Sequence, residues 1–465
     1  VIPAKPLTDY PPIQDDGKHD RATTQYDMYS LDCNVSSDAI GLLKIDFLGL
    51  RNLTTLQNAI DFTLKHAKVK VDVSELPLDD EKTFSLLRNG FTVGIFQLES
   101  SGMKRVARKL QPSRFSDLTA MVALYRPGPM ELIDDFISGK LKPETIVYPH
   151  NDLKPILEET YGIAVYQEQA LQIANLMAGY SLGEADILRR AIGKKKHSIM
   201  KKEQIKFIKQ SVEKGYTKKI AEKVWSYIEK FAGYGFNKAH ATAYAMIAYQ
   251  TAYMKANFPV EFMAALLTAE SGNQDKIPIV IEDCARLKIK VLPPSINDSF
   301  ISFSITKDED SLNKKAIRFG LSAIKNVGEA AIKAIIKERK KKFFASLTDF
   351  CRRVDHTKAN KKVIESLILV GAFDQFGNRS QMITSLEDIR QKAADHQKLQ
   401  NSPQVSLFKE DKSKNLTPQD IFQDIDEFDK ADLLNHEKEL LGFYLTEHPL
   451  ANSLKKIRSL ATHEI

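Results

Sequence analysis

The stretch "FAGYGFNKAHATAYAMIAYQTAYMKANFP" (231–259) joins a glycine-containing turn to one long helix. The residue before a proline disfavours helical backbone, so we expect the helix to stop before Pro259. Tyr249 and Tyr253 recur at helical spacing, and aromatic residues in that pattern most often belong to a core.

The turn that precedes this helix carries polar residues that a purely structural turn does not need. Lys238 and His240 lie at the helix N-terminus, where backbone N–H groups favour anions. Tyr244 follows one helical turn later and can stack on a base. Together with Tyr234 and Asn237, these residues form a candidate phosphate- or nucleotide-binding site.

A second basic site follows a predicted helix start in "SLGEADILRRAIGKKKHSIMKK" (181–202). Ser181 and Glu184 have the spacing of a capping box, so a helix should begin at about Leu182. Gly193 is well placed to end it. Phosphate binding suits the basic residues that follow; the alternative is a solvated face opposing the helix dipole. The candidate phosphate ligands are Arg189, Arg190, Lys194 and Lys195.

Arg126 precedes a rigid Pro-Gly-Pro turn in "ALYRPGPM" (123–130), which fixes the direction of its side chain. We include it as a candidate phosphate ligand, although an ordinary surface loop would have the same pattern.

"GLSAIKNVGEAAIKAIIKER" (320–339) has the form of a helix-hairpin-helix, and "LILVGAFDQFGNRS" (367–380) resembles a degenerate second copy. Gly328 is expected to permit the tight turn, and the amides after it can bind one backbone phosphate. The alternative is an ordinary helical hairpin. The candidate DNA-binding residues are Lys325, Asn326, Gly328 and Lys333.

Residues 391–416 are polar and predict a mobile loop, apart from the apolar island "QVSLF" (404–408). Leu407 and Phe408 can enter a pocket on a partner while the amide of Gln404 bonds at its rim. We interpret this pentapeptide as a recognition peptide for a partner protein.

"GLLKIDFLGL" (41–50) places an acid and a base in an apolar segment. With period two, Ile45 and Phe47 would face the packed side of a strand, whereas Lys44 and Asp46 would share the other side. A buried charge needs a partner or a metal ion, so Asp46 is a candidate metal ligand.

Composition indicates a globular protein of several domains: 465 residues, 43% hydrophobic, with a formal charge of +7. The three cysteines show no metal-site or disulfide pattern, and no run is long and apolar enough for a membrane span. A cytoplasmic setting is therefore expected. The chain begins at Val1, and we expect it to be an internal piece of a longer protein.

These blocks, with "GIFQLESSGM", "TYGIAVYQEQA" and "HEKELLGFYLTEHP", occur in an order that resembles the bacterial DNA polymerase III alpha-subunit family, the C-family replicative polymerases. The resemblance covers essentially the whole chain. It implies a mainly α fold with a small α/β part. The implied domains are the end of a polymerase-beta-like nucleotidyltransferase palm (1–55), helical fingers (56–304), a tandem helix-hairpin-helix and clamp-binding domain (305–450), and a linker (451–465) toward an oligonucleotide-binding (OB) domain.

The resemblance further implies template-directed transfer of a nucleotide from a dNTP to a primer 3′-hydroxyl, with two Mg²⁺ ions. Asp46 matches the third catalytic aspartate, with Lys44 beside it, and "QVSLF" matches the sliding-clamp peptide. The implied partners are primer–template DNA, dNTPs, the beta sliding clamp and other replicase subunits.

One feature of the family is missing from this sequence. The block with the other two catalytic aspartates does not occur in it, so we expect the chain alone to be inactive as a polymerase. Two alternatives remain open: a non-enzymatic DNA-binding clamp adaptor, and an error-prone polymerase of the same family.

Overall fold

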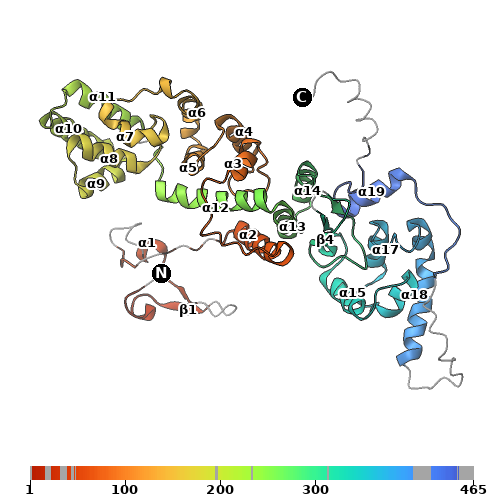
Figure 1. Cartoon of the computed structure of the whole chain (residues 1–465). Helices are drawn as coiled ribbons and strands as arrows, with labels where there is room; N and C mark the ends of the chain where they lie inside the picture. Colours follow the sequence, from red (N-terminus) through yellow and green to blue (C-terminus); the bar gives the residue numbers. More distant parts are fainter. Residues whose placement is uncertain are drawn as a thin grey trace. The chain divides into compact units, whose positions relative to one another are not determined.

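The computed structural model describes residues 3–15, 22–31, 39–42, 45, 47, 49–193, 197–231, 234–311, 314–401, 420–447 and 449. Backbone contacts group the chain into two compact units, Val1–Arg51 and Asn52–Ile465 (Figure 1).

The described part of the first unit contains four short elements: η1 (Leu7–Asp9), β1 (Ile13–Asp15), β2 (Ala22–Thr24) and α1 (Met28–Leu31). The two strands pair antiparallel, with Ile13 opposite Thr24.

The strand predicted at 41–50 is wrong at every described position of that segment, because none of them adopts regular structure. Ile45 is 46% exposed and Phe47 is 96% exposed, so the expected packed face is absent there. A strand needs neighbours to be stable, and β1 and β2 pair with each other.

The second unit begins with a long succession of helices. They are α2 (Arg51–Phe62), α3 (Glu81–Arg88), α4 (Ser101–Leu110), α5 (Phe115–Leu124), α6 (Ile133–Leu141), α7 (Lys154–Leu157), α8 (Gln167–Ala178), α9 (Leu182–Gly193), α10 (His197–Glu213), α11 (Lys218–Phe231), α12 (Lys238–Asn257), α13 (Pro259–Ala269) and α14 (Lys276–Arg286). A π-helical turn, η2 (Thr63–Ala67), extends α2, and short 3-10 turns occur at Pro129–Leu132, Pro143–Thr145, Asn151–Leu153 and Glu158–Thr160.

The long helix α12 contacts α3, α5 and α13 and links the parts of this unit (Figure 1). It ends at Asn257, which confirms the predicted stop before Pro259. Pro259 itself begins α13, a position where proline costs nothing because its missing N–H would have no helical partner. Tyr249 is fully buried, which confirms its predicted place in a core.

After α14 the chain forms a small sheet and a second group of helices. These elements are β3 (Val291–Leu292), β4 (Ser304–Lys307), β5 (Lys315–Arg318), the 3-10 turn η7 (Leu321–Ala323), α15 (Glu329–Lys341), α16 (Leu347–Arg353), α17 (Lys361–Leu369), α18 (Arg379–Asn401) and α19 (Lys430–Leu441). The strand order is β3-β5-β4, so β4 is an edge strand, antiparallel to β5. The predicted mainly α fold with a small strand component is confirmed.

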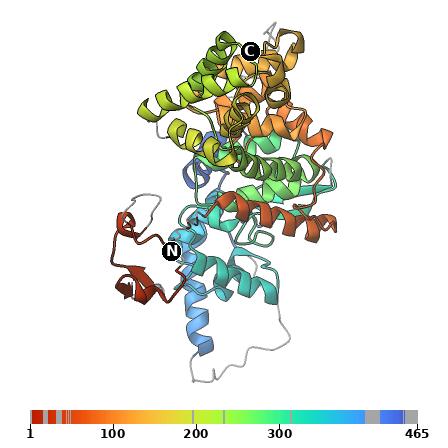
Figure 2. The same ribbon diagram turned by 90° about the vertical axis from the view of Figure 1, so that its left-hand side faces the viewer.

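Helix α18 corrects the prediction of a loop over 391–416, because it continues to Asn401. Glutamine, lysine, alanine and leucine dominate residues 391–400, and all four are good helix formers despite their mostly polar character. In both views α18 extends beyond α15 (Figures 1 and 2).

Among the described residues, buried apolar side chains form three clusters. One gathers α3 to α6 around α12, another gathers α7 to α11, and the largest gathers α2, α13 to α19 and the small sheet. Helix α12 contributes Tyr249 and Ala252 to the first cluster and Met254 to the largest.

A buried ion pair lies at the point where α12 passes between these clusters. The Lys255 Nζ atom donates to the carbonyl oxygens of Phe91 and Val93, at 2.9 and 2.7 Å, and to Asp283 Oδ2 at 2.6 Å. The two charged side chains are only 0% and 2% exposed. Burial lowers the pKa of Lys255, while Asp283 opposes that change. Every donor of the ammonium group is satisfied.

We predict that Lys255→Met lowers the free energy of unfolding by about 3–5 kcal/mol, because it leaves Asp283 buried and unpaired. Urea unfolding measures this change. Lys276→Met is the matched control: its pair with Glu99, at 2.7 Å, is half-exposed, and its loss should cost less than about 1 kcal/mol. The double variant Lys255→Met/Asp283→Leu should recover much of the loss. Equal effects of the two lysine variants would contradict the prediction.

Candidate nucleic-acid and nucleotide interface

The turn before α12 is held in place by strand-like hydrogen bonds to the segment before α8. Phe236 donates its N–H to the Val165 carbonyl at 3.1 Å, and Gln167 donates to the Phe236 carbonyl at 2.9 Å. Asn237 then caps α12, since its Oδ1 accepts the His240 N–H at 2.8 Å. This fixed turn determines where the first side chains of α12 lie.

Arg126 belongs to the same site, where its hydrogen bonds connect the end of α5 to the turn before α12. Its Nε donates to the Ala123 carbonyl at 2.9 Å, and its Nη2 donates to the Tyr234 carbonyl. Its guanidinium lies over the Phe236 ring, 4.4 Å from the centroid. The side chain of Arg126 thus has a fixed direction, as predicted: it points toward the turn before α12, where its guanidinium is half-buried.

Lys238 is engaged by two carboxylates. Its Nζ contacts Glu159 Oε2 at 2.5 Å, and its backbone N–H donates to the carboxylate of Glu168 at 3.0 and 3.1 Å. The ammonium group also lies 5.4 Å from the centre of the Tyr166 ring, whose hydroxyl is buried and has no hydrogen-bond partner among the described residues. An anion at Lys238 would therefore compete with Glu159.

Aromatic rings form a row along the first turns of α12. The centroids of Phe236 and His240 are 5.6 Å apart, those of His240 and Tyr244 are 4.4 Å apart, and those of Tyr244 and Phe96 are 5.2 Å apart. The His240 and Tyr244 planes differ by only 33°, so they are nearly stacked. His240 is exposed, so this row offers a face to a planar ligand such as a base.

The predicted start of α9 is confirmed, including its capping box. Glu184 Oε2 accepts the Ser181 N–H at 2.8 Å, and Ser181 Oγ accepts the Glu184 N–H at 3.3 Å. Lys206 of α10 pairs with the same carboxylate at 2.7 Å, and these hydrogen bonds lower the pKa of Glu184 to about 2. The structure places Arg189, half-buried, and Arg190 in α9, whereas Lys194 and Lys195 lie outside the described residues.

The first hairpin joins η7 to α15 through a tight turn, but the turn is made differently from the prediction. Asn326 takes the left-handed conformation, with φ 70°, and its Nδ2 donates to Ser366 Oγ at 3.1 Å. Gly328 is extended, with φ −77° and ψ 157°. The expectation that Gly328 permits the turn is therefore wrong: asparagine tolerates the left-handed region well enough to do so.

The surroundings of Gly328 suit a different role. Among the described residues, apart from its two chain neighbours, no heavy atom lies within 4 Å of the place where a Cβ on Gly328 would stand. In the part of the chain that the structure describes, no side chain caps α15, whose first turn follows Gly328 directly. Lys325 is exposed near this opening, and Lys333 pairs with Glu329 at 2.7 Å on the exposed face of α15. The backbone is accessible here to a phosphate.

In the second hairpin, between α17 and α18, the first backbone N–H groups of α18 are already bound by a side chain of this chain. Glu427 Oε2 accepts the Arg379 N–H at 2.8 Å, and Oε1 accepts the Ser380 N–H at 3.0 Å. Burial alone would raise the pKa of Glu427, but these amide bonds outweigh it and lower the pKa. Asp420 binds the first amides of α16 in the same way, accepting from Leu347 and Thr348 at 2.8 Å.

Several predicted residues cannot be placed. Asp46, Lys44 and the peptide residues Gln404, Leu407 and Phe408 lie outside the described residues. Within the described ranges, no three His, Cys, Asp or Glu side chains lie together as a metal-ion site. The magnesium site and the clamp peptide stay predictions.

Sequence reasoning missed the acidic residues that order this interface. Glu159, Glu168 and Glu427 each bind a helix start far away in the sequence. A local signal exists only for Glu168, which belongs to the quoted block "TYGIAVYQEQA". The partners of the other two depend on tertiary structure.

Known proteins resemble this chain along its whole length. A family described as the bacterial DNA polymerase III alpha subunit finger domain matches residues 52–215, and a helix-hairpin-helix motif matches residues 288–382. The DNA polymerase III subunit alpha of Thermus aquaticus is 45% identical over 473 residues, covering 100% of this chain and 37% of that protein. The proteins of the same name from Bacillus subtilis and Escherichia coli K12 are 45% and 40% identical, each covering 98% of this chain.

The chain spans 37% to 40% of the length of these relatives. The resemblance inferred from the sequence blocks is confirmed over all of this chain. The chain belongs to the family of bacterial DNA polymerase III alpha subunits.

Proposed function

We propose that this chain carries out template-directed DNA synthesis as part of a replicative DNA polymerase. The proposal is based on one observation: proteins named DNA polymerase III subunit alpha align with at least 98% of the length of this chain, at 40–45% identity. In the reaction, the primer 3′-oxygen attacks the α-phosphorus of a dNTP and pyrophosphate leaves. The substrates are primer–template DNA and dNTPs.

Asp46 is proposed as one carboxylate ligand for Mg²⁺, an ion that prefers oxygen ligands. Mg²⁺ would supply charge stabilisation at the attacking and leaving oxygens. The paired-aspartate block of the family does not occur among the 465 residues. We therefore propose that the remaining carboxylates come from outside this sequence and that the chain alone is inactive.

The turn before α12 and the helix α9 are proposed to face the incoming nucleotide and the nascent base pair. The ring row suits a base, while Arg126 and Lys238 supply positive charge beside it. The Lys238–Glu159 pair is half-exposed, and such pairs are weak, so a phosphate can replace Glu159 at small cost. The other residues proposed for this role are Arg189, Arg190, Lys194, Lys195, Tyr234, Asn237 and His240.

The first hairpin is proposed to bind a backbone phosphate of duplex DNA, with Lys325, Asn326 and Lys333 around the open glycine. The lack of a cap on α15 supports this assignment. The second hairpin lacks such an opening, since Glu427 already binds its amides.

The peptide Gln404, Leu407 and Phe408 is proposed to bind the beta sliding clamp, and the chain to work with other replicase subunits in the cytoplasm. In the part of the chain that the structure describes, no helix has the length and apolar character needed to cross a bilayer.

We predict no primer extension by the 465-residue chain with Mg²⁺, and full loss of extension on Asp46→Ala in a polypeptide that also carries the aspartate block. The physical reason is that one carboxylate cannot hold both ions. Extension of a labelled primer in gels measures both. Asp61→Ala, at an exposed position of α2, is the control and should extend normally. Robust extension by the chain alone would overturn the proposal that its site is incomplete.

We predict that His240→Ala in the same complete polymerase raises the KM for dNTPs by about 5-fold or more, as loss of one stacking contact implies. His240→Phe should restore most of the affinity, because it keeps a ring against Tyr244. Steady-state kinetics measures the change. His150→Ala, which removes a ring contact with Tyr216, is the control and should leave KM unchanged. A Phe variant as weak as the Ala variant would argue against stacking.

We predict that Gly328→Ala weakens duplex DNA binding while the free energy of unfolding stays the same. An extended backbone accepts alanine. The added Cβ would contact no described residue beyond its own chain neighbours, but it would stand where a phosphate approaches. Lys325→Gln should lower the salt dependence of log K by about 0.9, as loss of one phosphate contact implies.

Fluorescence anisotropy with a labelled duplex and urea unfolding make these measurements. Gly272→Ala, at another glycine with open surroundings, serves as the control and should bind normally. Unchanged affinity of the Gly328 variant would exclude this hairpin from DNA contact.

A further inference from the structure

A groove follows the edge strand β4 across the second unit. Three adjoining cavities of about 610, 520 and 510 Å³ form it. The first two cavities share Phe300, Ser304 and Lys340, and the last two share Lys65 and His66; Ile305 lines all three. The groove therefore connects the end of α15 with the π-helical turn η2.

The groove is strongly basic. Its cationic lining residues are Lys65, Lys68, Lys307, Lys314, Lys315, Arg318, Arg339, Lys340 and Lys342, whereas its acidic ones are Asp298 and Glu309. Lys314 and Lys315 are paired with Glu309 and Glu261, at 3.8 and 2.6 Å. Within the described ranges, Lys65, Lys68, Lys307, Lys340 and Lys342 form no ion pair, and all five are exposed. Such a surface attracts a polyanion.

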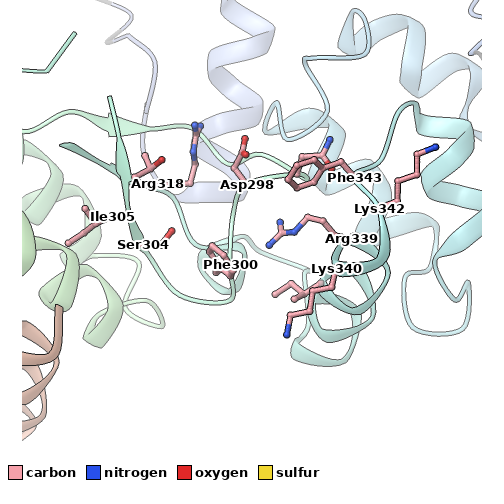
Figure 3. A pocket seen from close by; sticks show the side chains of 12 residues that line it. Asp298, Phe300, Ser304, Ile305, Arg318, Arg339, Lys340, Lys342 and Phe343 are labelled. Atoms are coloured by element: carbon pink, nitrogen blue, oxygen red, sulfur yellow. The ribbon is translucent and has the colours of Figure 1, made fainter. Parts of the chain in front are cut away.

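Two aromatic rings stand at the first cavity. Phe300 is 53% exposed and Phe343 is 66% exposed. The buried guanidinium of Arg339 holds one of them: it donates to the carbonyls of Ile296 and Ser299, at 2.9 and 2.6 Å, and lies 5.1 Å from the centre of the Phe300 ring. Figure 3 shows these two side chains beside each other. The ring is thus kept exposed by a fixed neighbour.

Arg318 adds a positive charge to the lining of this cavity. Its Nη1 donates to the Pro293 carbonyl at 2.9 Å, but its Nε is buried and has no hydrogen-bond partner in the described structure. Burial lowers the pKa of Arg318, whose charge faces the groove near Asp298.

From this combination we infer that the β4 groove binds a segment of single-stranded DNA. Unpaired lysines at intervals match a phosphate backbone, and exposed rings beside them offer stacking faces to bases. Duplex DNA fits less well, because its bases already pair and stack with each other and expose no free face to Phe300 or Phe343. The groove uses the C-terminal end of α15, whereas the phosphate contact proposed for the first hairpin lies at the start of α15. The groove goes beyond the polymerase function proposed above.

The test places a reporter in the groove of the whole chain. Phe343→Trp adds an exposed indole, while the natural Trp225 is fully buried. Titration with a 20-nucleotide oligo(dT) should quench the added fluorescence, and a duplex of equal length should not. Phe300→Ala in this background should weaken the quenching titration by about 5-fold or more. Lys340→Gln should lower the salt dependence of log K by about 0.7, as loss of one single-strand phosphate contact implies.

Two controls separate this groove from other DNA-binding surfaces. Lys82→Gln, at an exposed lysine of α3 that lines none of these cavities, should leave the titration unchanged. Lys325→Gln should reduce duplex binding but not the quenching by oligo(dT), so failure of the hairpin proposal and failure of this one are distinguishable. Quenching by an acidic peptide or by the duplex as strongly as by oligo(dT), or no quenching at all, would overturn the inference.

Discussion

The fold of the second unit depends on the buried ammonium group of Lys255. It is the one charge of α12 that lies fully inside, and it binds carbonyls of residues 91 and 93 and the carboxylate of Asp283 in α14. Desolvating two ions is costly, so such a pair persists only where every donor is satisfied. Its geometry fixes α12 both lengthwise and in rotation, because three acceptors from two segments must converge on one nitrogen atom.

The anchoring of α12 at Lys255 also affects the candidate nucleotide site, because α12 is one continuous helix. The same helix that is anchored at Lys255 begins at Lys238, and Asn237 caps it there. Helices propagate position along their length, so His240 and Tyr244 are set by packing at the other end as well as by the turn. The aromatic rings of the site therefore have fixed positions. The Lys238–Glu159 ion pair, in contrast, is exposed to water, so an anionic ligand can replace Glu159 as the partner of Lys238.

The sequence predicted those features that local chemistry determines. The capping box at Ser181, the helix stop before Pro259 and the position of the first hairpin follow from neighbouring residues, and the structure has each of them. The failures have nonlocal causes. An alternating pattern such as that of 41–50 forms a strand only if a partner strand lies beside it, and the pattern itself does not show whether one does. The polar composition of 391–401 suggested a loop, although its glutamine, lysine and alanine residues favour helix and continue α18. The small sheet gave no signal because β4 and β5 contain four residues each.

Helices α15, α16 and α18 each begin with backbone N–H groups that have no partner within the helix, but within the described structure only those of α16 and α18 are bound by a carboxylate. Asp420 and Glu427 bring negative charge to the first amides of α16 and α18, which satisfies donors that a helix leaves unpaired. At the start of α15, no carboxylate of the described residues binds the first amides in this way. Asp420 follows residues 402–419, so its hydrogen bonds to Leu347 and Thr348 attach the chain to α16 directly after the segment with the proposed clamp peptide. The Asp420 carboxylate therefore satisfies the first amides of α16 and also fixes where the chain rejoins the folded region, while the start of α15 stays available to a phosphate.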